Sequence, residues 1–87
     1  MEINPSEYKI LIVDDVMSNV LLLKVLLTNE KFQIVTANNG RQALDQVEKE
    51  KPDLVLLDVM MPDMSGFEVA QHLKANPKTA DIPIIFL

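Results

Sequence analysis

The chain has no cysteine among its 87 residues, which excludes disulfide bonds, zinc–thiolate sites and redox-active thiols. Long hydrophobic runs are also missing, since no unbroken aliphatic stretch exceeds four residues, as in Val20–Leu23, so no segment is expected to span a bilayer. Basic residues are few: eight lysines and arginines against 13 acidic residues give a net charge of −5. Nucleic acids and anionic membranes require a basic patch, and we therefore expect neither as a partner.

The N-terminus lacks the basic and then apolar pattern of a secretory signal and carries Glu2 and Glu7 instead, so a cytoplasmic protein is expected. Hydrophobic residues make up 48% of the chain and charged residues 24%, which is typical of a globular protein rather than a disordered one. The length suits one small core. We therefore expect a single domain over residues 1–87.

Two patterns alternate along the chain. Short β-branched and aliphatic runs, typical of strands buried on both faces, occupy Tyr8–Val13, Phe32–Thr36, Leu54–Leu57 and Ile82–Leu87. Between them lie three helical patterns, namely Ser18–Glu30 with Ser18 as its expected N-cap, a stretch after Asn39-Gly40 that ends by Pro52, and a stretch from Gly66 that Pro77 stops. Strict alternation predicts an α/β fold, a doubly wound parallel sheet with helices on both faces.

The three predicted helices differ in their hydrophobic pattern. The first is apolar over a wide arc, so something in addition to one face of the sheet is expected to cover it. The second and third carry narrower apolar stripes, at Ala43, Leu44 and Val47 and at Phe67, Ala70 and Leu73.

Three aspartates occupy the ends of two predicted strands. Asp14 and Asp15 directly follow Tyr8–Val13, and Asp58 directly follows Leu54–Leu57. Ligands of open α/β sheets bind outside the carboxyl ends of the strands, where the strand order reverses. If the first and third strands are neighbours there, the three carboxylates converge in one crevice.

Converging carboxylates repel one another, and either a proton or a cation must relieve the repulsion. A hard divalent ion with oxygen ligands suits such a group, and Mg²⁺ with open coordination positions suits phosphoryl chemistry. One carboxylate can itself act as the nucleophile and form an aspartyl phosphate. The alternative is structural, because an Asp pair after a strand can start a turn and cap the next helix. The three aspartates together favour a metal or phosphoryl site.

The residues around Asp58 resemble the receiver domain of two-component response regulators. The resemblance covers essentially the whole chain, and its most specific part is the run from Asp58 through Met61-Pro62 to Gly66. The acidic pair Asp14-Asp15 also fits the family pattern, as does a fourth strand at Ile82-Pro83-Ile84-Ile85. The resemblance implies a flavodoxin-like fold.

The resemblance also implies roles for individual residues. Asp58 would accept a phosphoryl group from a phosphohistidine on a sensor histidine kinase, which makes it the expected phosphoacceptor. Asp15 and Asp58 would coordinate Mg²⁺ together with the backbone carbonyl of Met60, and Asp14 would bind the ion through water or orient its ligands. The domain would be no enzyme beyond self-catalysed phosphotransfer and autodephosphorylation.

The chain departs from the family pattern at its C-terminal end. The family fold has five strands and five helices, whereas this sequence is expected to stop after the fourth strand, with four strands and three helices. A Ser or Thr and a Lys that contact the phosphoryl group in the family would lie beyond Leu87, and Lys9, Lys24 and Lys74 do not match that Lys. A hydrophobic strand left at the edge recruits other strands. We therefore predict a homo-oligomer, with a domain-swapped dimer as one form.

Two other functions remain open. The first is an interaction or dimerisation module that has the receiver fold and performs no phosphotransfer. The second is a Mg²⁺-dependent phosphohydrolase with an aspartyl nucleophile. Such an enzyme is expected to place a second Asp two residues after the nucleophile, where this chain has Met60.

Overall fold

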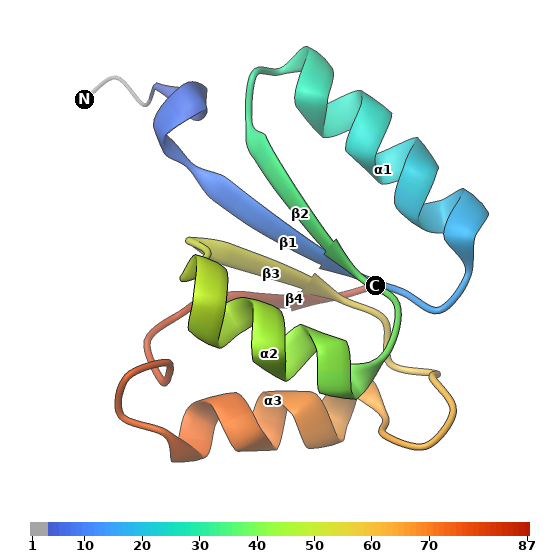
Figure 1. Cartoon of the computed structure of the whole chain (residues 1–87), viewed down its shortest axis with the longest axis vertical. Helices are drawn as coiled ribbons and strands as arrows, with labels where there is room; N and C mark the ends of the chain where they lie inside the picture. The colour runs from blue at the N-terminus through green and yellow to red at the C-terminus, as the bar shows by residue number, and fades with distance from the viewer. Residues whose placement is uncertain (1–3) are drawn as a thin grey trace.

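The computed structural model describes residues 4–87, which form one four-stranded parallel sheet with helices on both sides (Figure 1). The strands lie in the order β2-β1-β3-β4. In chain order the elements are a 3-10 turn η1 (Pro5–Glu7), β1 (Lys9–Val13), α1 (Met17–Asn29), β2 (Gln33–Ala37), α2 (Gly40–Glu50), β3 (Leu54–Leu57), α3 (Gly66–Ala75) and β4 (Ile84–Phe86). The predicted four strands and three helices, and the flavodoxin-like doubly wound fold, are confirmed.

The central strands are buried on both faces, which explains their continuous apolar sequence. Side chains alternate between the two faces of the sheet. Leu11 and Val13 of β1 belong to the core cluster that α2 and α3 cover. Ile10 and Ile12 belong to a second cluster that includes Val20 of α1. The core is therefore two layers of side chains, one on each side of β1 and β3.

The register of β1 and β3 decides where the functional edge lies. The parallel pairing runs from Ile10 opposite Leu54 to Val13 opposite Leu57. Both strands therefore end at the same level, and the residues that follow them emerge side by side. The three aspartates can converge only because β1 and β3 are neighbours in the sheet.

The starts of α2 and α3 follow from local sequence. Asn39 caps α2, because its side chain accepts a 2.8 Å hydrogen bond from the backbone N–H of Gln42. Ser65 and Glu68 form a reciprocal capping box at the start of α3. These caps fix two helix starts at the edge of the sheet where the aspartates lie.

Several details of the predicted elements are wrong, and β1 and β2 each begin one residue later than the apolar runs that predicted them. Ser18 is no N-cap, since α1 starts at Met17 with Val16 before it and without a side-chain cap bond. Phe67 does not lie on the buried side of α3, which is formed by Gly66, Val69 and Leu73. The last strand is shorter than predicted, Ile84–Phe86, although the carbonyl of Pro83 accepts a hydrogen bond from the N–H of Val55 and the N–H of Leu87 donates to the carbonyl of Leu57.

Candidate functional site

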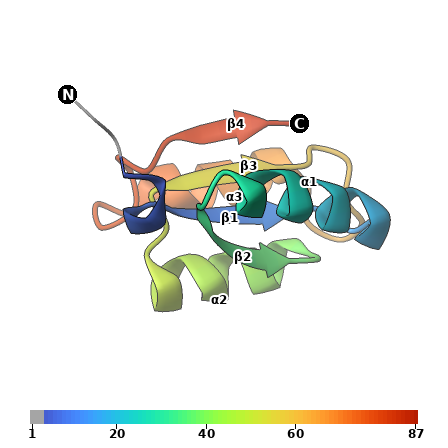
Figure 2. The ribbon, with the colours of Figure 1, turned by 90° about the horizontal axis from the view of Figure 1, so that it is seen from above.

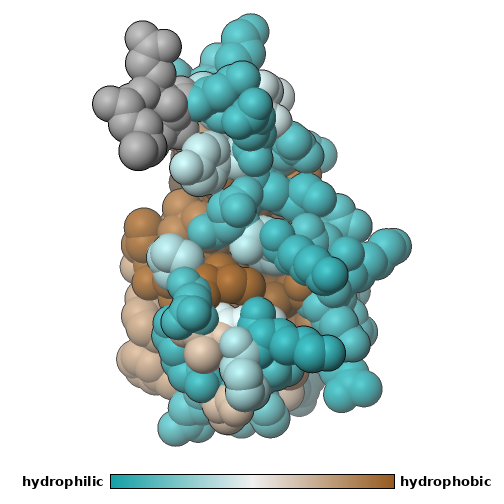
Figure 3. All heavy atoms as spheres, turned by 90° about the vertical axis from the view of Figure 1, so that its left-hand side faces the viewer, coloured by the Kyte–Doolittle hydropathy of each residue, from teal (hydrophilic) through white to brown (hydrophobic). Residues whose placement is uncertain are grey.

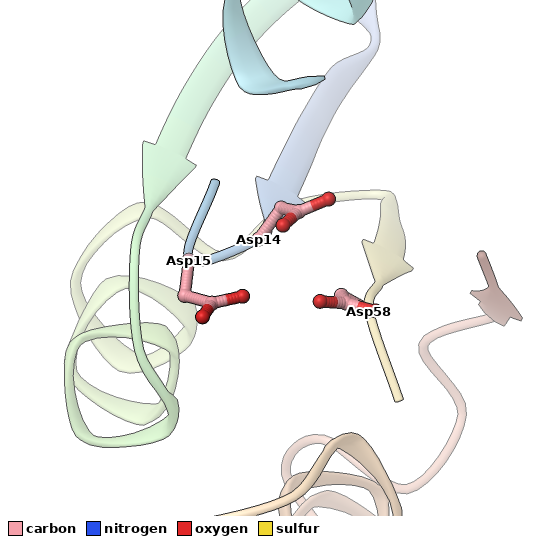
Figure 4. Close-up of side chains that lie close together, drawn as sticks. All are labelled: Asp14, Asp15 and Asp58. Carbon is pink, nitrogen blue, oxygen red and sulfur yellow. The ribbon is translucent and has the colours of Figure 1, made fainter. Parts of the chain in front are cut away.

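The carboxylates of Asp14, Asp15 and Asp58 point toward one another at the carboxyl edge of the sheet (Figure 4). One oxygen of each lies within 4.8 Å of the others. Asp14 and Asp15 follow β1, and Asp58 follows β3. The structure thus brings together all three aspartates that the sequence singled out. Such a group could hold a metal ion.

Asp14 is the most firmly held of the three. Its residue is buried, with 4% of its surface exposed. Its Oδ1 accepts a 2.9 Å bond from the N–H of Val16, and its Oδ2 accepts a 3.2 Å bond from the side-chain amide of Asn19. Both oxygens are therefore oriented by the start of α1. Residue spacing does not predict the role of Asn19, because its side chain reaches Asp14 only through the way the loop after β1 folds back on the first turn of α1.

Asp58 is fixed through its backbone. Its N–H donates to the carbonyl of Val13 at 2.9 Å, which ties the end of β3 to the end of β1. The N–H of Met60 donates to Oδ1 of Asp58 at 3.3 Å. The residue is half-buried, so its carboxylate remains accessible from solvent. Asp58 therefore combines a rigid backbone with an open side chain, which suits a reactive group.

Gly66 is required by a close approach to Asp58. Its N–H donates to the carbonyl of Val59 at 3.0 Å, and a Cβ at position 66 would overlap the carbonyl oxygen of Asp58. The start of α3 thus packs directly against the backbone that carries Asp58. This contact explains physically why a glycine stands eight residues after the aspartate.

The electrostatics of the group favour a bound cation. Burial raises the pKa of Asp58 above its ordinary value, the charges of Asp14 and Asp15 raise it further, and the hydrogen bond from the N–H of Met60 lowers it. A divalent ion would remove this penalty by neutralising the carboxylates. The oxygen-only donors fit Mg²⁺, which prefers carboxylate and carbonyl oxygens and retains waters. Whether the carbonyl of Met60 is a ligand stays a prediction.

Two of the three lysines named in the sequence analysis, Lys9 and Lys74, make contacts elsewhere. Lys9 lies at the opposite end of β1, and its Nζ donates to the backbone carbonyl and the carboxylate of Glu50, both at 3.2 Å. The Nζ of Lys74 donates to the carbonyls of Ala80 and Ile82. Neither lysine therefore serves the carboxylate group in this structure.

One wide groove in the described residues is separate from the aspartates. It has a volume of about 1100 Å³ and lies between α2, α3 and the segment before β4. Its lining includes Leu44, Lys51, His72 and Ile82. None of the three aspartates lines the groove, so it is not part of the carboxylate site. Among residues 4–87, no helix combines the length and the apolar character needed to cross a membrane.

Residues 10–87 match the family model described as response regulator receiver domain. Among curated proteins, response regulator PleD of Caulobacter vibrioides is 46% identical over 79 residues, which are 91% of this chain and 17% of PleD. The chain therefore spans less than a fifth of the length of that relative.

Solved structures give the same assignment. The N-terminal domain of a response regulator receiver protein from Methanoculleus marisnigri JR1 superposes with a TM-score of 0.89 at 38% identity, covering 91% of this chain and 64% of that one. The signal receiver domain of a signal transduction histidine kinase from Syntrophus aciditrophicus gives a TM-score of 0.88 at 36% identity, covering 92% of this chain and 61% of that one.

Proposed function

The chain belongs to the family of response regulator receiver domains, and we propose that it accepts a phosphoryl group on Asp58 from a phosphohistidine of a sensor histidine kinase. The observation that carries the proposal is the convergence of three carboxylates from the ends of β1 and β3. Phosphorylation would change the charge at Asp58 and bias a two-state element that controls a downstream output. The proposed role is therefore that of a switch in a phosphorelay.

Asp58 is proposed as the nucleophile because its carboxylate is half-buried and accessible. An ionised carboxylate needs no base to activate it. One of its oxygens forms a bond to phosphorus as the phosphorus–nitrogen bond of the donor breaks, and the electron pair of that bond stays on the imidazole. The product is an aspartyl phosphate on Asp58. Positioning and neutralisation of charge dominate such transfers, and the hydrogen bond to the N–H of Met60 supports the positioning.

Asp14, Asp15, Asp58 and the backbone carbonyl of Met60 are proposed to hold Mg²⁺. Bound there, the ion would neutralise negative charge on the phosphoryl oxygens. Asp14 is the best oriented of these groups, because both of its oxygens accept N–H bonds. We therefore assign Asp14 the role of holding the ion through water or of orienting its ligands. No catalysis beyond transfer to and hydrolysis from Asp58 is proposed.

The test is labelling of the purified chain with acetyl phosphate. With Mg²⁺ present, intact-mass analysis should show one added phosphoryl group that withstands acid and is removed by hydroxylamine. Asp58→Asn should abolish the label, and chelation of the metal should prevent it. Asp63→Asn is a matched control, since Asp63 lies in the loop after β3 outside the carboxylate group. It should leave the label intact.

Two results would reject the proposal. One is a folded chain that takes no label at any Mg²⁺ concentration, and the other is a label that survives Asp58→Asn. The first result would favour the interaction module without phosphotransfer.

A further inference from the structure

Asp14 is the one polar or charged residue that is buried among residues 4–87. Burying a carboxylate is costly unless hydrogen-bond donors reach its oxygens. Two donors do so: the backbone N–H of Val16 reaches Oδ1 at 2.9 Å, and the side-chain amide of Asn19 reaches Oδ2 at 3.2 Å. In the described part of the chain, Asn19 therefore supplies the only side-chain N–H that donates to Asp14.

Asn19 is brought to Asp14 by the way α1 starts. The helix begins at Met17, beyond the tip of β1 (Figure 2). Asn19 lies in its first turn, where its own N–H donates to the carbonyl of Val16 at 3.1 Å. The N–H of Asp14 donates to the carbonyl of Ala37, at the end of β2, at 3.2 Å. The backbone of Asp14 is thus fixed by the sheet and its side chain by the first turn of α1.

The two donors leave the carboxylate of Asp14 little freedom to turn. The last torsion of an aspartate side chain is soft, so a bond to one oxygen does not fix the other oxygen. In Asp14 the bond from Asn19 is the second one, and it fixes the plane of the carboxylate. The lone pairs that remain are free for the space that Asp14 shares with Asp15 and Asp58 (Figure 4).

The chemistry of this donor suits a cation site. A lysine or arginine at position 19 would also donate, but its positive charge would compete with a bound cation. The amide of Asn19 is neutral, so it orients Asp14 and leaves the charge of the carboxylate available. Lys24 is the single charged residue of α1 and lies five residues further along the helix.

We propose that Asn19 is a positioning residue of the carboxylate site, which holds Asp14 in the orientation in which the three aspartates bind a divalent cation. This inference rests on the proposed function, because the cation is the Mg²⁺ assigned to the site above. Asn19 does not touch the ion and acts through Asp14. Removal of a hydrogen-bond partner of a metal ligand typically costs roughly 10–100-fold in metal affinity, because the ligand must then be ordered when the ion binds.

The alternative is that Asn19 only satisfies a buried charge. Its removal would then destabilise the chain equally with and without Mg²⁺, and the folded chain would bind the ion as tightly as before. The two roles therefore differ in the metal affinity of the folded chain, whereas both affect its stability.

The first test is calorimetric titration of Mg²⁺ into the purified chain, without any phosphodonor. Asn19→Ala should raise the dissociation constant roughly tenfold or more. The far-ultraviolet circular dichroism should stay unchanged, because position 19 is exposed and alanine is a strong helix former.

Asn29→Ala is the matched control for this titration. It removes the same type of side chain from the last residue of α1, about 15 Å away along the helix. Figure 3, which faces the opposite end of the sheet, shows hydrophilic residues over its top, where α1 ends. The control should bind Mg²⁺ as tightly as the unmodified chain.

The second test asks whether Asn19 acts through Asp14. In an Asp14→Ala background there is no carboxylate for Asn19 to orient, so Asn19→Ala should change the dissociation constant by less than about twofold there. An effect of full size in that background would overturn the inference.

The third test is the dependence of labelling by acetyl phosphate on the concentration of Mg²⁺. Asn19→Ala should raise the half-saturating Mg²⁺ concentration by the same factor as the dissociation constant, and it should change the rate at saturating Mg²⁺ far less. A merely structural contact would not produce this split.

The outcomes separate the two proposals. A folded Asn19→Ala chain that binds Mg²⁺ as tightly as the unmodified chain overturns the role of Asn19 and leaves the phosphoacceptor assignment untouched. An unmodified chain that binds Mg²⁺ but takes no label contradicts the phosphoacceptor assignment alone. An unmodified chain that binds no Mg²⁺ overturns both.

Discussion

Removing one charge from the carboxylate group should stabilise the metal-free chain. In Asp58→Asn, the amide keeps the shape of the side chain and removes its repulsion from Asp14 and Asp15. A substitution at a site that is merely structural would lower the free energy of unfolding instead, because the position lies at the end of a core strand. The sign of the effect therefore separates a strained ligand site from an ordinary turn.

The magnitude follows from the separation of the charges. The oxygens lie within 4.8 Å of one another, where one pair of like charges costs roughly 0.9 kcal/mol in bulk water and about 3.5 kcal/mol at the effective dielectric constant of a protein surface. Asp15 is exposed, so the lower value is the better guide for the pair that it forms with Asp58. We expect a gain of about 1–2 kcal/mol in the free energy of unfolding, which corresponds to a rise in Tm of about 5 °C or more.

The assay is thermal and urea unfolding at pH 7 in low salt with a metal chelator. Added salt should shrink the gain, because an exposed pair is screened. Mg²⁺ should stabilise the unmodified chain more than Asp58→Asn, since a ligand of the folded state stabilises in proportion to its occupancy. Asp45→Asn is the matched control, because Asp45 is exposed on α2 and outside the group. It changes the net charge equally and tests whether overall charge is the cause.

Two outcomes would refute the reasoning. The first is an Asp58→Asn chain that is less stable than the unmodified chain without metal, which would mean that the carboxylate makes net favourable contacts. The second is an equal response of both chains to Mg²⁺, which would mean that the three aspartates do not act as one site.

Further predictions concern pH, packing and capping. Burial and then the charges of Asp14 and Asp15 raise the pKa of Asp58 above 3.8, so just above that pH the folded metal-free chain binds more protons than the unfolded chain. Its free energy of unfolding should therefore fall as the pH rises through that window, which urea titrations between about pH 4 and pH 6 would show. The affinity for Mg²⁺ should fall as the pH drops into the same window, because protons compete with the ion for Asp58. Gly66→Ala should cost about 1–3 kcal/mol and reduce labelling of Asp58, because the new methyl group meets backbone. Leu11→Ala should cost about 2–5 kcal/mol in urea unfolding, since Leu11 is fully buried. Ser65→Ala should cost about 1 kcal/mol through loss of the capping box and leave labelling of Asp58 largely unchanged.

Much of the fold could be predicted because the relevant signals are local. Buried parallel strands read as short apolar runs, and the runs around Leu11 and Leu56 predicted β1 and β3. The predicted boundaries were less accurate where the local signal was ambiguous. Phe67 fits a three-residue stripe with Ala70 and Leu73, yet it is exposed by 56% and its ring lies 5.1 Å from that of Phe86. A spacing of three residues is compatible with Phe67 on the buried side of α3 or on an exposed side. Its packing against Phe86 of β4, a tertiary contact, places it on the exposed side.

The sequence by itself determined the alternation of strands and helices and the placement of Asp14, Asp15 and Asp58 at strand ends, because both depend on residue order alone. Tertiary structure decided that β1 and β3 are neighbours, that Asn19 orients Asp14, and that the Asp58 backbone leaves no room for a side chain at Gly66. It also decided which sides of α1 remain exposed. These features depend on contacts between segments far apart in the chain or on the exact start of a helix, and neither is encoded in the spacing of residues within one segment.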